Sequence, residues 1–134
     1  MNIGIVVADF HGKIAEEMLA HAKSAAEKNK FKVMSVVHVT GVFDVPLPLK
    51  RLLARNDIDG AIVLGAVVRG GTSHDEVVAY TCAEKVGELS LLYDKPVGYG
   101  ISGPRMTKKQ AKARAKGFAV RAVEAVKRIL EENE

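Results

Sequence analysis

The chain has 134 residues, the length of one ordinary domain, and we expect residues 1–134 to form a single domain. Its hydrophobic content of 48% and charged content of 27% exclude a disordered tail, a fibrous repeat and a disulfide scaffold. The net charge of +4 is mildly basic and suits either RNA or an anionic small substrate. Because aromatic residues make up only 5% and tryptophan is absent, we expect no nucleic-acid partner.

The N-terminal residues 1–8 lack the basic region of a signal peptide and are typical of a first strand. The longest apolar runs, such as residues 61–68, are too short to span a bilayer, so we expect no membrane partner. The one cysteine, Cys82, has no internal disulfide partner, and we interpret it as buried packing in a reducing, cytoplasmic protein. No group of residues has metal-ligand spacing, and we predict no protein-bound metal.

Short runs rich in Ile and Val predict four strands, at residues 3–8, 31–39, 61–68 and 96–101. Helical patterns separate and follow them, at residues 14–28, 47–55, 74–93 and 107–130. Two capping boxes are predicted at helix starts, Ser73 with Glu76 and Thr107 with Gln110. The alternation predicts a three-layer α/β/α sandwich with a central four-stranded parallel sheet in flavodoxin-like order.

In such sheets, ligands bind beyond the carboxyl ends of the strands, here residues 9–12, 40–44, 69–76 and 99–104. Within the third segment, Gly70-Gly71-Thr72-Ser73 follows a buried strand and opens a helix. Its backbone N–H groups favour a bound phosphate about as strongly as a plain turn with a helix cap. The segment is neither a P-loop nor a dinucleotide fingerprint.

His74 is predicted to lie at the first helical turn, beside this candidate anion site. The helix N-terminus disfavours its imidazolium form, whereas Asp75, Glu76 and a bound phosphate favour it, so a proton-shuttle role is expected. The alternative, a surface histidine without a task, has equal weight. His11 follows the first strand and is a further candidate to line the site.

Three aromatic residues, Phe10, Phe43 and Tyr99, are predicted on loops at one edge of the sheet, where they either stack on a planar ring or plug the loops onto the core. Asp44 either accepts hydrogen bonds from polyol hydroxyls or caps the helix beginning at Pro46. The C-terminal helix carries a basic run that is typical of a solvated face. Arg114 is singled out in it because a guanidinium suits phosphate.

Three motifs carry a resemblance to a known family: Gly41-Val42-Phe43-Asp44-Val45-Pro46-Leu47, then Leu64-Gly65-Ala66-Val67-Val68-Arg69-Gly70-Gly71-Thr72-Ser73-His74, then Tyr93-Asp94-Lys95-Pro96-Val97 with Gly100-Ile101-Ser102-Gly103-Pro104. Together they resemble the 6,7-dimethyl-8-ribityllumazine synthase family, and its archaeal branch most of all. The resemblance runs from residue 3 to about residue 130.

The resemblance implies condensation of 5-amino-6-(D-ribitylamino)uracil with 3,4-dihydroxy-2-butanone 4-phosphate, with release of phosphate and water and without a cofactor. It also implies substrate contacts at Phe10 and in the first two motifs. Phe10 would stack on the pyrimidine, and Val42, Phe43 and Asp44 would hold the ribityl chain. Backbone groups of Ala66, Val67 and Val68 would meet the ring edge.

The same resemblance implies that Gly71, Thr72 and Arg114 bind the phosphate, helped by Lys116, and that His74 transfers protons. Tyr99 would belong to a neighbouring subunit's wall of the site, because the family builds its sites between subunits of a pentamer. A homo-oligomer is therefore expected, either a pentamer or a shell of pentamers. Two positions depart from the family pattern: His11 replaces the usual asparagine and Tyr99 the usual phenylalanine.

Other functions fit the sequence less well. The paralogous archaeal riboflavin synthase is not expected to keep the Gly-Gly-Thr-Ser-His stretch, because it handles no phosphorylated substrate. A receiver-type signalling module needs an aspartate where Arg69-Gly70 stands, and a flavodoxin-like electron carrier needs a Ser/Thr-rich loop after the first strand. A nucleic-acid-binding domain is compatible with the charge and predicts a steep dependence of affinity on salt.

Overall fold

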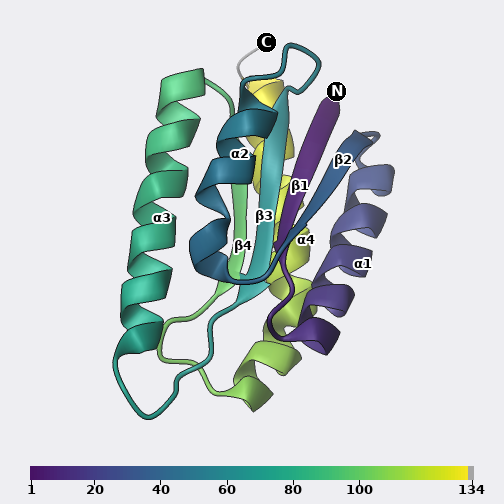
Figure 1. Ribbon diagram of the computed structural model, residues 1–134. Helices are drawn as coiled ribbons and strands as arrows, with labels where there is room; N and C mark the ends of the chain where they lie inside the picture. Colours follow the sequence, from purple (N-terminus) through teal and green to yellow (C-terminus); the bar gives the residue numbers. More distant parts are fainter. Residues whose placement is uncertain (133–134) are drawn as a thin grey trace.

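The computed structural model describes residues 1–132, which alternate between strands and helices as the hydrophobic pattern predicts (Figure 1). In chain order the elements are β1 (Asn2–Ala8), α1 (Gly12–Lys28), β2 (Lys32–Val39), a 3₁₀ turn η1 (Val42–Asp44), α2 (Pro46–Leu53), β3 (Gly60–Ala66), α3 (His74–Tyr93), β4 (Val97–Ser102) and α4 (Lys108–Glu132). Of these, η1 is the one element that the sequence did not predict.

The four strands form one parallel sheet in the order β2-β1-β3-β4, which confirms the predicted flavodoxin-like arrangement. β3 is buried at every position and β1 at all but its first, whereas β2 is only partly buried along most of its length. A strand between two neighbours and two helical layers has no exposed face, so uniformly apolar sequences occupy the centre of the sheet.

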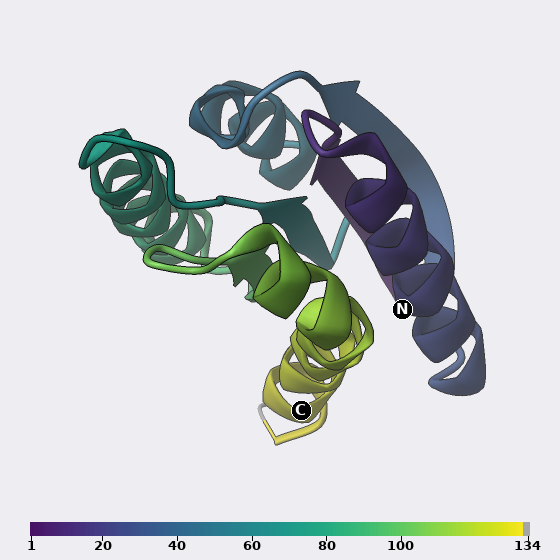
Figure 2. The ribbon, with the colours of Figure 1, turned by 90° about the horizontal axis from the view of Figure 1, so that it is seen from below.

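Helices cover both faces of the sheet: α1 and α4 pack on one face, and α2 and α3 on the other (Figure 2). On the first face, α4 presents a stripe of buried alanines, Ala111, Ala115, Ala119 and Ala122. The small stripe lets α4 approach β4 so closely that a Cβ atom at Gly98 would overlap the carbonyl group of Ala122. Gly98 is therefore required by packing.

Two sequence predictions near the strand ends are wrong. The third strand was predicted to reach residue 68, but β3 ends at Ala66 and Val67 already begins the following loop. Val67 is only 6% exposed because it packs in the core on the α2 and α3 side, and its N–H still donates to the Ser102 carbonyl of β4 (2.8 Å), so the apolar run continues one residue past the last paired residue. Tyr99 was counted with the loop after the fourth strand, but it lies inside β4, opposite Val63, as the predicted strand at residues 96–101 implied.

One predicted capping box is confirmed and the other is wrong. At the start of α4, the Thr107 N–H donates to Gln110 Oε1 (2.9 Å) and the Gln110 N–H donates to Thr107 Oγ1 (3.2 Å). At the start of α3, Ser73 makes no side-chain cap, because its backbone is not in the extended conformation of an N-cap. Glu76 is engaged elsewhere, with Arg105.

The loops after β1, β2, β3 and β4 gather at the carboxyl end of the sheet, and the N-terminus lies at the opposite end (Figure 1). The parallel topology brings these loops together although they are far apart in the sequence. Within residues 1–132, no helix combines the length and apolar character needed to cross a membrane.

Candidate active site

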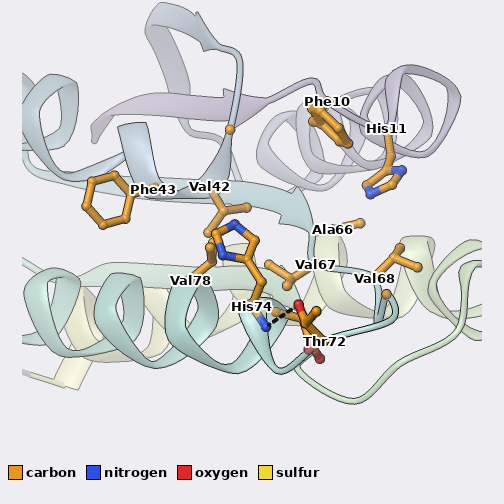
Figure 3. A pocket seen from close by; sticks show the side chains of 13 residues that line it. Phe10, His11, Val42, Phe43, Ala66, Val67, Val68, Thr72, His74 and Val78 are labelled. Atoms are coloured by element: carbon orange, nitrogen blue, oxygen red, sulfur yellow. Dashed lines mark hydrogen bonds between the residues drawn. The ribbon is translucent and has the colours of Figure 1, made fainter.

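A pocket of about 440 Å³ opens at the carboxyl end of the sheet (Figure 3). Its walls come from the β1–α1, β2–α2 and β3–α3 connections and the first turns of α3. The lining residues are Phe10, His11, Gly41, Val42, Phe43, Ala66, Val67, Val68, Gly70, Thr72, His74, Asp75 and Val78. The wall is mostly apolar, with a few polar groups concentrated on the β3–α3 side, which is the usual composition of a small-molecule site.

The β1–α1 loop contributes an exposed aromatic ring and a histidine. Phe10 is 72% exposed, and its ring meets the His11 ring edge-on, with centroids 5.0 Å apart. Burial lowers the pKa of His11, and the nearby charge of Lys108 lowers it further. A neutral imidazole at this position both donates and accepts hydrogen bonds.

The β2–α2 connection places a second exposed ring at the pocket. The Gly41 N–H donates to Asp44 Oδ2 (3.1 Å) and closes the turn η1, which buries Val42 and leaves Phe43 62% exposed. Asp44 therefore caps η1, and the predicted cap at Pro46 is wrong. Its carboxylate lines an adjoining hollow of about 530 Å³, which shares Phe43 with the pocket.

The β3–α3 loop carries the polar part of the site. Residues 70–74 are exposed, and a Cβ atom at Gly70 or Gly71 would meet nothing within 4 Å. Within residues 1–132, the backbone N–H groups of Gly71, Thr72 and Ser73 have no hydrogen-bond acceptor. Unpaired N–H groups at the start of a 20-residue helix form an electropositive surface suited to an anion.

His74 begins α3 beside these N–H groups. Its own N–H donates to Thr72 Oγ1 (3.3 Å), and its ring extends from the helix toward Val42 across the pocket (Figure 3). The imidazole therefore lies between the polar loop and the aromatic side of the pocket. A side chain in this place is able to exchange protons with a ligand that bridges both parts.

Asp75 is a pocket residue that the sequence did not single out as one. It is only 5% exposed, although an aspartate in the first turn of a helix is usually solvated. Its carboxylate accepts a hydrogen bond from the Arg105 N–H (2.9 Å), 30 residues further along the chain. Nothing in the local pattern indicates that contact, so burial of Asp75 was not predictable. Gly41, Gly70 and Val78 were likewise not named among the candidates.

A second hollow, of about 560 Å³, adjoins the pocket and shares Phe10 and His11 with it. Three lysines line it, Lys13, Lys108 and Lys112, and no carboxylate within residues 1–132 forms an ion pair with them. The surroundings of Phe10 are therefore cationic. In the same part of the chain, no three His, Cys, Asp or Glu side chains gather as metal ligands.

The structure does not bring two predicted site residues to the pocket of their own chain. Arg114 is exposed on α4 and lies outside the pocket lining. Tyr99 is half-buried against the α2 and α3 side of the sheet, where its hydroxyl lies beside the Cys82 thiol. Burial raises the pKa of the Tyr99 hydroxyl and raises that of the Cys82 thiol to about 11. The hydroxyl that distinguishes Tyr99 from phenylalanine thus has a partner.

Eight of the twelve candidate site residues line the pocket together: Phe10, Val42, Phe43, Ala66, Val67, Val68, Thr72 and His74. Gly71 lies between two lining residues, and Asp44 lines the adjoining hollow. Tyr99 and Arg114 lie apart from this group, as does Lys116, the expected helper at the phosphate, which is exposed on α4.

Comparison with known proteins identifies the family. The family model described as 6,7-dimethyl-8-ribityllumazine synthase matches residues 1–133. Similar curated proteins of that name occur in Methanobrevibacter smithii (48% identity, 92% of this chain and 89% of the relative) and Methanothermobacter thermautotrophicus (46%, 93% and 89%). Another occurs in Methanocaldococcus jannaschii (42%, 97% and 92%). The chain, in which the first two motifs line one pocket, therefore belongs to the 6,7-dimethyl-8-ribityllumazine synthase family.

Proposed function

We propose that this protein condenses 5-amino-6-(D-ribitylamino)uracil with 3,4-dihydroxy-2-butanone 4-phosphate in riboflavin biosynthesis, and needs no cofactor. The products are 6,7-dimethyl-8-ribityllumazine, inorganic phosphate and water. The observation that carries the proposal is a single pocket that combines exposed aromatic rings, unpaired backbone N–H groups and a histidine. These features suit a planar ring, an anion and a proton transfer respectively.

The pyrimidine and its ribityl chain occupy the apolar side of the pocket in this proposal. Phe10 stacks on the pyrimidine ring, and its 72% exposure leaves a ring face free for that contact. Phe43 and Val42 hold the ribityl chain, together with Asp44, whose second carboxylate oxygen is left over after the Gly41 hydrogen bond. Backbone groups of residues 66–68 meet the ring edge.

The phosphate binds at the β3–α3 loop. Gly71 and Thr72 offer it the unpaired N–H groups described above, and the α3 dipole favours its negative charge. His74 lies next to this position and transfers protons during imine formation and phosphate elimination. The lysines of the adjoining hollow draw the anionic substrate toward the pocket by long-range attraction.

Arg114 and Tyr99 are proposed to complete the site of a neighbouring subunit, because neither lines the pocket of its own chain. A homo-oligomer, a pentamer or a shell of pentamers, would supply that neighbour. Large apolar side chains exposed on α2 and α3 support association: Leu47 56%, Val77 60%, Tyr80 56%, Leu91 84% and Leu92 70%. Exposed apolar side chains of this size, all on the two helices that cover one face of the sheet, are typical of an interface. We place the assembly in the cytoplasm, without a nucleic-acid or membrane partner.

Lumazine formation tests the proposed function directly. The purified protein is mixed with both substrates, and the absorbance of the lumazine is followed against the spontaneous reaction. We expect a clear acceleration that excess inorganic phosphate suppresses competitively with the butanone phosphate. A folded protein that leaves the spontaneous rate unchanged would contradict the proposal, and conversion of the lumazine into riboflavin would assign the paralogous activity instead.

Arg114→Ala is expected to raise the KM for the butanone phosphate roughly tenfold to 100-fold, the loss of a charged hydrogen bond, with a smaller effect on the pyrimidine. Arg128→Ala is the matched control, because Arg128 lies on the same helix and pairs with Glu132. Co-assembly of Arg114→Ala with His74→Ala subunits should restore part of the activity if each site takes these residues from two chains. Equal losses for both substrates would remove Arg114 from the phosphate site.

A further inference from the structure

Two consecutive residues of the β4–α4 loop hold both ends of the β3–α3 loop. At its start, the Arg69 N–H donates to the Met106 carbonyl (2.8 Å). At its end, the Arg105 N–H donates to Asp75 Oδ2 (2.9 Å). Residues 70–74, which carry His74 and the unpaired N–H groups, thus lie between two residues, Arg69 and Asp75, that are hydrogen-bonded to the β4–α4 loop. We call these contacts of Arg69, Asp75 and Glu76 with Arg105 and Met106 the loop clamp.

The side chain of Arg105 adds a third contact to the loop clamp. Its Nε donates to Glu76 Oε1 (2.6 Å), and this hydrogen bond raises the pKa of Arg105 above its ordinary value. Arg105 has a φ of 60°, a left-handed conformation that a residue with a side chain adopts only when its surroundings require it. In this conformation its N–H meets Asp75 while its side chain reaches Glu76. Backbone and side chain therefore bind adjacent carboxylates at the start of α3.

The loop that supplies these contacts also lies against the pocket wall. Gly103 has a φ of 104°, and a Cβ atom there would overlap the carbonyl oxygen of Val67. Val67 is itself a pocket residue. The β4–α4 loop therefore supports the β3 side of the pocket from behind, in addition to holding the loop above it.

Asp75 is the central member of the loop clamp. It is 5% exposed, lines the pocket and directly follows His74. A carboxylate in that place needs a partner, and the Arg105 N–H is the hydrogen-bond donor that residues 1–132 provide. Because His74 and Asp75 share the first turn of α3, the hydrogen bond that fixes Asp75 also fixes where the His74 ring begins.

We infer that Asp75 and Arg105 are positioning residues, which hold His74 and the N–H groups of residues 71–73 in the geometry that the reaction needs. The inference rests on the proposed function for its effect on rate. Its structural part, that the loop clamp orders residues 70–74, stands independently of any activity. Asp75 acts through His74 and not on the substrate, so its loss should lower kcat more than it changes the KM for either substrate.

Asp75→Ala tests the loop clamp with two readouts. We expect kcat to fall by about 10²-fold, the loss typical of a catalytic group misplaced by about 1 Å, with both KM values little changed. We also expect faster amide hydrogen exchange at residues 70–74, measured on the protein without substrates. Asp57→Asn is the matched control, because Asp57 pairs with Arg55 in the connection before β3, at the other end of the sheet.

Two further variants separate the hydrogen bond from the charge and from simple unfolding. Asp75→Asn keeps an oxygen that accepts from the Arg105 N–H, so it should recover most of the rate and the slow exchange. Arg105→Gly keeps the N–H and suits a φ of 60°, but removes the contact with Glu76, so its rate should lie between those of wild type and Asp75→Ala. Asp75→Asn also carries the test if Asp75→Ala does not fold.

The inference is overturned if active wild-type protein and Asp75→Ala share the same kcat, or if Asp75→Asn loses as much as Asp75→Ala. Unchanged exchange at residues 70–74 in Asp75→Ala would also overturn it. If wild-type protein fails to accelerate lumazine formation, the proposed function fails, and the exchange measurement alone decides whether the loop clamp orders the loop.

Discussion

The two ends of the parallel sheet differ in how their polar groups are used. At the amino end, side chains hold the connections between elements: the Asn2 N–H donates to Asp59 Oδ2 (2.7 Å), and Ser90 Oγ donates to the Lys95 carbonyl (2.7 Å). Lys95 Nζ donates to the carbonyls of Leu53 and Arg55, both at 2.8 Å. Through Lys95, the C-terminal ends of α2 and α3 are thus hydrogen-bonded to the segment that leads into β4.

At the carboxyl end, outside the loop clamp, exposed aromatic rings and backbone N–H groups are instead left available to a ligand. Phe10 and Phe43 are 72% and 62% exposed, and the N–H groups of residues 71–73 have no acceptor within residues 1–132. Such exposure contributes nothing to folding and suits a ligand that supplies the missing contacts. Residues at the amino end therefore stabilise the fold, whereas the exposed residues at the carboxyl end serve the reaction. Variants at the amino end should change the free energy of unfolding, and variants at the carboxyl end should change kcat or KM.

The largest expected effect is at the carboxyl end. His74→Ala should lower kcat roughly 10²- to 10⁴-fold, the contribution of a general acid–base group, while the free energy of unfolding changes by about 0.5 kcal/mol or less because the side chain is exposed. Steady-state kinetics and urea unfolding measure the two quantities. An unchanged kcat would remove His74 from the mechanism.

A change at the amino end should have the opposite signature. Lys95→Met removes two charged hydrogen bonds to carbonyl groups and should cost about 1–2 kcal/mol in the free energy of unfolding, with kcat unchanged. Lys85→Met is the control, because the exposed pair of Lys85 with Glu88 should contribute less than about 0.5 kcal/mol. A lower kcat in Lys95→Met at full folding would show that the two ends are coupled.

The smallest effect is expected at Phe10. Phe10→Ala should weaken binding of the pyrimidine by about 0.5–1.5 kcal/mol, the contribution of aromatic stacking, seen as a higher KM for that substrate alone. Stability should hardly change, since most of the ring is exposed. Phe10→Tyr keeps the ring face and serves as the control. A clear loss of stability in Phe10→Ala would mean that the ring packs on the fold rather than on a ligand.

The fold was predictable to within a few residues because strand and helix periods differ and because the buried strands are uniformly apolar. The errors of prediction lie near the ends of strands and at the start of a helix. Val67 is apolar because it packs in the core just past the last paired residue of β3, and Tyr99 lies within β4, as the predicted strand 96–101 implied, rather than on the loop after it. The Ser73 cap failed because its backbone is not extended, and the Glu76 side chain, the other half of the predicted capping box, is held by Arg105.

The amino-acid sequence by itself determined the alternation of strands and helices, the parallel sheet and the gathering of four strand-end segments at one edge, three of which line the pocket. Each follows from local periodicity and from the rule that parallel strands end at one edge. Only the tertiary structure decided that Asp75 is buried against Arg105 and that Tyr99 lies beside Cys82. These contacts join residues far apart in the chain, and their energies depend on packing that no local pattern records.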